Sequence, residues 1–89
     1  MRAVVTVTGK DKKGIIAKVS AFLSEKGANI EDISQTILGE YFAMIMIVDI
    51  STATEEISVL AASCAELGKQ IGMTIYIQHE DIFNAMHSI

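Results

Sequence analysis

Residues 41–50, YFAMIMIVDI, constrain the fold more than any other stretch because both faces of this segment are apolar. Alternate residues of a strand point to opposite sides of a sheet. A strand that is apolar on both sides is typical of a position buried on both faces. The segment therefore predicts a central strand covered on both sides. One face would carry Phe42, Met44, Met46, Val48 and Ile50, and the other Tyr41, Ala43, Ile45 and Ile47.

The segments around this strand show alternating strand and helix patterns. The pattern of a strand occurs in residues 2–8, which are rich in β-branched side chains. It occurs again in residues 73–78, where apolar and polar side chains alternate. Residues 29–38 also predict a strand, with a bulge near Glu31–Asp32 that reconciles its apolar positions, and a hairpin turn at Gly39–Glu40 follows.

Two helices are expected between these strands. Residues 15–26 and 57–71 repeat apolar residues at helical spacing, and Gly27 suits the position after the first helix. Thr52 and Glu55 match a capping box for the second helix. The residues after His79 predict one further short helix.

The order is strand, helix, strand, strand, helix, strand. The compact arrangement for this order is the ferredoxin-like α+β sandwich, a four-stranded antiparallel sheet with two helices on one face. The first and third strands are then central. Because the helices cover only one face, the second apolar face of the third strand must meet something else. We predict a homodimer, with either facing sheets or joined edge strands.

The length and the net charge of the chain limit the functions that it can have. With 89 residues, the chain is expected to form a single domain, residues 1–89. A net charge of −4 and one arginine argue against direct nucleic-acid binding, which usually requires a basic face. No apolar run is long enough to span a membrane, and the first residues lack a signal-peptide layout, so we expect a cytoplasmic protein. The single cysteine, Cys64, is expected in the core.

The best candidate for a small-molecule site is the loop between the first strand and the first helix. Residues 9–14, GKDKKG, place two glycines and three lysines before a helix N-terminus, where backbone N–H groups lack partners within the helix. Such a loop suits an anionic or zwitterionic ligand. The plainer interpretation is a turn with solvated lysines, in which Asp11 only caps the helix.

Several short motifs, in register over almost the whole chain, resemble an ACT domain. Within that superfamily the sequence is similar to the small stand-alone UPF0237 proteins, which are related to the glycine cleavage system transcriptional repressor. The motifs are VTVTGKD (5–11), DKKGII (11–16), GANI (27–30), DISQT (32–36), YFAM (41–44) and EDIFNAMH (80–87).

The resemblance implies a regulatory module, usually dimeric, that binds an amino acid or a similar small effector at a subunit interface. The loop through Gly14 would lie on one side of the ligand, and Asn29 and Ile30 on the other. We therefore expect the ligand-binding residues to be Gly9, Asp11, Lys12, Lys13, Gly14, Ile15, Asn29 and Ile30. Asn29 has an alternative role as a turn residue.

A second function stays open: a protein-interaction subunit that docks a larger enzyme or regulator through its sheet face, without a small ligand. Catalysis is not expected, because the loop lacks the arginine of acylphosphatase-like chemistry and no nucleophile lies near a histidine. We expect no cofactor and no metal, since His79 and His87 are too far apart to share one helical face pair. RNA recognition on this topology would require stacking aromatic residues and a basic surface.

Overall fold

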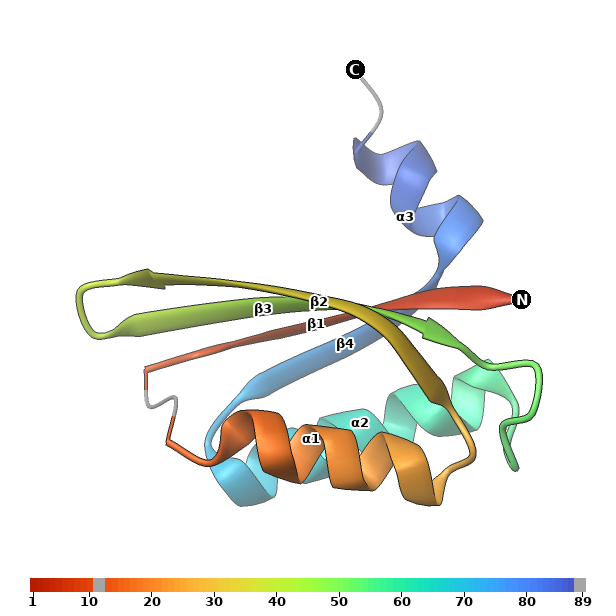
Figure 1. The fold of residues 1–89 in the computed structure, drawn as a ribbon, viewed down its shortest axis with the longest axis horizontal. Helices are drawn as coiled ribbons and strands as arrows, with labels where there is room; N and C mark the ends of the chain where they lie inside the picture. The colour runs from red at the N-terminus through yellow and green to blue at the C-terminus, as the bar shows by residue number, and fades with distance from the viewer. Residues whose placement is uncertain (11–12, 88–89) are drawn as a thin grey trace.

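The computed structural model describes residues 1–10 and 13–87. The strands form one antiparallel sheet in the order β2-β3-β1-β4, so β1 and β3 are central. This topology confirms the predicted ferredoxin-like arrangement (Figure 1). The elements are β1 (Arg2–Gly9), α1 (Ile15–Glu25), β2 (Asn29–Leu38), β3 (Tyr41–Asp49), α2 (Ile57–Ile71), β4 (Thr74–His79) and α3 (Glu80–His87).

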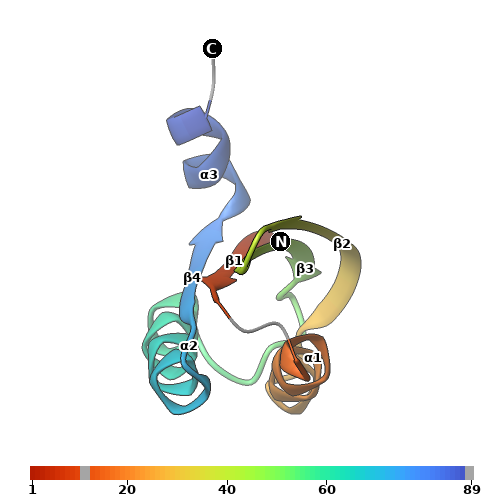
Figure 2. The ribbon, with the colours of Figure 1, turned by 90° about the vertical axis from the view of Figure 1, so that its left-hand side faces the viewer.

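Helices α1 and α2 pack side by side on one face of the sheet, and α3 extends from the end of β4 on the other side (Figures 1 and 2). The hydrophobic core lies between the sheet and these two helices. Its fully buried side chains come from both central strands and both helices, as expected for a two-layer fold. The largest of them are Leu23, Met44, Met46, Leu60, Val5, Val7, Val19, Val48 and Cys64.

The predicted bulge in β2 is confirmed. The pairing of β2 with β3 shifts between Ile30 and Asp32, so Glu31 is the extra residue. The shift changes which side the following residues face. As a result Ile30, opposite Val48, and Ile33, opposite Met46, both lie on the side covered by the helices.

As the placement of both helices on one face predicts, a single chain covers β3 on one side only. The side of the sheet away from α1 and α2 remains largely uncovered, and Ile45 and Tyr41 of β3 are 41% and 56% exposed. The reason is that both long helices share one face, while the short α3 stands at one end of the other (Figure 1). We call this second side the open face. Strand alternation assigns to it Val4, Thr6 and Thr8 of β1, Asp32, Ser34, Thr36 and Leu38 of β2, Tyr41, Ala43, Ile45 and Ile47 of β3, and Thr74, Tyr76 and Gln78 of β4.

The predicted capping box before α2 is wrong. Glu56 occupies the N-cap position of α2, and no side chain caps the helix. The Thr52 hydroxyl instead donates to the carbonyl oxygen of Gly27 at 2.9 Å. Glu55 Oε1 lies 2.8 Å from Lys26 Nζ. Thr52 and Glu55 therefore hold the segment before α2 against the C-terminal end of α1.

Candidate functional site

The loop after β1 leads into the N-terminus of α1. Gly14 is the N-cap residue of α1, its φ of 73° is left-handed, and no side chain of the described residues caps the helix there. The first helical hydrogen bond runs from Lys18 N–H to Gly14 O at 3.1 Å. The N–H groups of the first turn, from Ile15 onward, therefore have no acceptor within the helix. A Cβ on Gly14 would meet no described atom within 4 Å.

The other predicted loop residues divide into three groups. Lys13 is exposed at the surface beside Gly14. Gly9 and Ile15 have packing roles: a Cβ on Gly9 would overlap the Met73 sulfur, and the Ile15 side chain is buried in the core. Ile15 thus offers a ligand only its backbone N–H group. Asp11 and Lys12 lie outside the described residues, and so does the predicted cap by Asp11.

One chain does not bring the predicted loop residues and the start of β2 together. Gly9 pairs with Phe42, whereas Asn29 pairs with Asp49 at the other end of β3. At about 3.4 Å per residue, these two ends lie roughly 24 Å apart. Asn29 is exposed, and Ile30 is half-buried against the core. The two groups of predicted residues therefore belong to different ends of the molecule.

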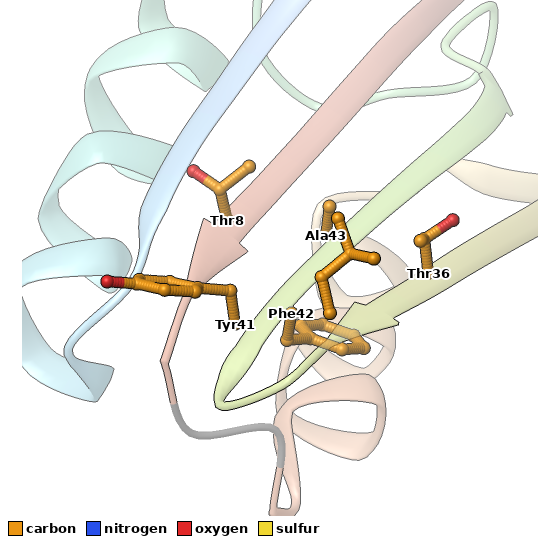
Figure 3. Close-up of a pocket in the computed structure, with 7 residues that line it drawn as sticks. Thr8, Thr36, Tyr41, Phe42 and Ala43 are labelled. Atoms are coloured by element: carbon orange, nitrogen blue, oxygen red, sulfur yellow. The ribbon is translucent and has the colours of Figure 1, made fainter.

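A small hollow lies at the loop end of the open face (Figure 3). Its volume of about 180 Å³ is below the roughly 300 Å³ at which small-molecule pockets usually begin. The Tyr41 ring extends over the end of β1, and the Lys10 ammonium group lies 5.6 Å from the ring centre. Sequence reasoning missed this hollow, although the alternation that places Tyr41 and Ala43 on one face was a signal for it. Its lining residues are Thr8, Gly9, Thr36, Leu38, Tyr41, Phe42 and Ala43.

Two side chains, Cys64 and Asp49, have pKa values that the structure clearly shifts. Burial raises the pKa of the Cys64 thiol to about 11. Hydrogen bonds from Ser51 lower the pKa of the exposed Asp49 carboxyl group.

Within residues 1–10 and 13–87, no group of three or more His, Cys, Asp or Glu side chains is arranged to hold a metal ion. No helix in this described part is long and apolar enough to cross a membrane.

Comparison with protein families matches residues 2–78 to the ACT domain. The chain belongs to the ACT domain family. A UPF0237 protein of Clostridium perfringens is 53% identical over 89 residues, and the alignment covers both chains completely. The solved structure of an ACT domain protein from Streptococcus pneumoniae has a TM-score of 0.84 and 44% identity, covering 98% of each chain. These relatives confirm the resemblance to stand-alone UPF0237 proteins.

The ACT fold of this chain also occurs within longer proteins. A solved structure assigned as a glycine cleavage system transcriptional repressor has a TM-score of 0.70 and 24% identity, over 89% of this chain and 47% of the other. At that identity, the similarity shows a shared fold. The chain and this longer protein therefore share the ACT fold.

Proposed function

We propose that this ACT domain, residues 1–89, is a cytoplasmic, non-enzymatic regulatory module that binds an amino acid or similar small effector at a homodimer interface. The observation that carries the proposal is the N-terminus of α1 at Gly14, where no side chain of the described residues caps the helix and an added Cβ would meet no described atom within 4 Å. The N–H groups of a first helical turn attract a carboxylate through both hydrogen bonding and the helix dipole. Lys13 adds positive charge beside them.

The proposed site needs two copies of the chain. The loop at Gly14 and the start of β2 at Asn29 lie at opposite ends of one molecule. If two β2 strands pair antiparallel about a two-fold axis, the loop of one copy approaches Asn29 of the other. An effector between them would contact backbone N–H groups from one copy and the Asn29 amide from the other.

Strand β2 has the properties of an association edge. It is a ten-residue edge strand paired only with β3, and almost all of its residues are exposed. Residues 33–38, ISQTIL, contain no charge and no proline, which are the usual protections of exposed edges. Ile33 and Ile37 are 38% and 49% exposed and would be covered by a joined edge.

A second candidate function is the docking of a larger enzyme or regulator through the open face, without a small ligand. It is favoured by the exposure of Leu38 and Tyr76 on that face. Capture of one defined enzyme or regulator from source cells by wild type, but not by Tyr76→Glu, would support it. Capture of this chain alone would count against it.

A thermal-shift screen with the twenty amino acids and small anions tests the leading proposal. Gly14→Val should abolish the response, and Gly39→Val is the matched control. Both glycines have positive φ, 73° and 61°, and neither has an atom within 4 Å of an added Cβ. The two variants therefore carry the same kind of backbone strain, but only Gly14 supplies the helix N-terminus on which the proposal depends.

The expected shift is large enough to measure. An effector at a hundred times its dissociation constant adds about 2.7 kcal/mol to the unfolding free energy. For a domain of this size that raises the Tm by roughly 10–20 °C. We expect this increase in wild type and in folded Gly39→Val, and its loss in folded Gly14→Val. The proposal fails if no compound shifts wild type, or if Gly14→Val responds as wild type does.

A further inference from the structure

A groove lies between helix α3 and the open face of the sheet. The helix stands on the open-face side, beyond the end of β4 (Figure 1), and contacts both β1 and β4. The volume of the groove is about 450 Å³, which is within the range of roughly 300–1,000 Å³ that small-molecule pockets occupy. The groove is therefore large enough for a small organic molecule. Among the described residues, its lining consists of Thr6, Ile45, Tyr76, Gln78, Phe83 and Met86.

The floor of the groove follows from the strand register. Thr6 of β1 pairs with Ile45 of β3 on one side and with Tyr76 of β4 on the other, so these three side chains form one row across the open face. Gln78 lies two residues beyond Tyr76 and therefore points to the same face. Ile45 is 41% exposed and Tyr76 is 65% exposed. The floor thus presents large apolar surfaces on both sides of one hydroxyl group.

The wall of the groove is one side of α3. Phe83 and Met86 are three residues apart, so they lie on the same side of the helix. Met86 is 64% exposed, so the wall leaves the groove accessible in a single chain. Aromatic rings pack well against other rings and against the polarizable sulfur of methionine. The wall and the Tyr76 ring on the floor therefore suit a flat ring system.

The groove is uncharged. None of its six described lining side chains is ionisable near neutral pH. Glu80, at the start of α3, is paired with Arg2 at 3.0 Å. A charged ligand would lose hydration in the groove without gaining an opposite charge among these lining residues. The lining therefore favours a neutral ligand.

Gln78 supplies a polar group for recognition. Its Nε2 donates to the Met86 sulfur at 3.2 Å. A thioether sulfur is a weak acceptor, so a carbonyl oxygen of a ligand would be a stronger partner for the same amide group. The amide oxygen of Gln78 can accept from an N–H group at the same time. The side chain thus matches a ligand edge that has a carbonyl group beside an N–H group.

We propose that this groove is a second small-molecule site, which binds a neutral, flat heteroaromatic molecule whose edge carries a carbonyl group beside an N–H group. The ring packs against Tyr76, Phe83 and Met86, and the edge pairs with the Gln78 amide in place of the Met86 sulfur. This site is separate from the proposed effector site, which uses the N-terminus of α1 and the β2 edge of two copies.

Methyl NMR with quinolin-2-one as the probe tests the proposal. This probe is neutral and flat and has a lactam edge, and its ring current should shift the Ile45 methyl signals of wild type. Met86→Arg should weaken binding by about tenfold, because it places a charge in the groove. Ile82→Arg is the matched control and should bind as wild type does. Ile82 is also on α3 and is 55% exposed, but it lines a separate hollow beside α2.

Gln78→Leu tests the polar edge, with naphthalene as the comparison probe because it has two fused rings and no polar edge. Loss of one hydrogen bond should weaken quinolin-2-one by about fivefold and leave the affinity for naphthalene within about twofold. Equal changes for both probes would overturn the role of Gln78.

Two further outcomes would overturn the site itself. One is binding by folded Met86→Arg that equals wild type. The other is a wild type whose Ile45 signals do not respond to quinolin-2-one, including the case in which they change only with protein concentration because a second copy fills the groove. Gly14→Val should bind quinolin-2-one as wild type does, which separates this result from the outcome for the effector site.

Discussion

Replacement of Gly27 by alanine should be among the most damaging single changes in this chain. Gly27 ends α1 with a φ of 78°, and its carbonyl oxygen accepts from the Thr52 hydroxyl. A Cβ at this position would lie 2.5 Å from the Thr52 carbonyl oxygen. Because that atom belongs to the backbone, no side-chain rotation relieves the overlap.

The cost has two parts. The left-handed conformation costs alanine about 1–2 kcal/mol, and overpacking against fixed atoms costs about 1–3 kcal/mol. We therefore expect a loss of about 2–5 kcal/mol in the free energy of unfolding. For a domain of this size, that lowers the Tm by roughly 8–40 °C.

Urea unfolding, followed by circular dichroism, measures this loss directly. Gly14→Ala is the control, because its φ of 73° is similar but an added Cβ meets nothing within 4 Å. It should lose only the conformational part, about 1–2 kcal/mol. If Gly27→Ala loses no more stability than Gly14→Ala, the close approach of the Thr52 carbonyl oxygen is not what requires glycine at position 27.

Four further predictions concern single side chains. Because burial raises the pKa of Cys64 to about 11, the thiol should resist alkylation at pH 8 until the protein unfolds. In addition, wild type should lose stability between about pH 9 and 11, where only the unfolded thiol ionises, and Cys64→Ala should lack this loss. Ser51→Ala should raise the Asp49 pKa part of the way toward 3.8 in a carboxyl NMR titration, because it removes the side-chain hydrogen bond that lowers the pKa most and keeps the backbone one. Leu60→Ala should cost about 2–5 kcal/mol in urea unfolding, because Leu60 is fully buried.

Periodicity predicted most of the fold because the burial pattern repeats along each element. The apolar residues of β1, β3 and both long helices lie where their spacing places them, and the bulge at Glu31 follows from a break in the β2 pattern. The capping box failed for a different reason. Helix α2 begins at Ile57, so Thr52 lies four residues before the N-cap residue Glu56, and its hydroxyl donates to Gly27, which is distant in the sequence and adjacent in space.

The candidate site was predicted less completely. Sequence reasoning identified Gly14 at a helix start, because glycine and helix signals are local. It did not reveal that Gly9 is needed for packing. The absence of a Cβ at Gly9 leaves room for the Met73 side chain, and the sequence alone does not distinguish this role from ligand binding. It also did not show that Asn29 and the loop occupy opposite ends of the chain, since that separation depends on strand register.

The measurement that tests the central claim most directly is complementation between two defective variants. Gly14→Val and Asn29→Ala each damage one side of the proposed effector site, so neither should bind the amino acid identified by the thermal screen. After subunit exchange at equal concentrations, random pairing places one intact site in each mixed dimer, about a quarter of all sites. Calorimetric titration of the mixture should recover that fraction with wild-type affinity. If the mixture binds no amino acid although mass spectrometry confirms that mixed dimers have formed, the site is not shared between two copies.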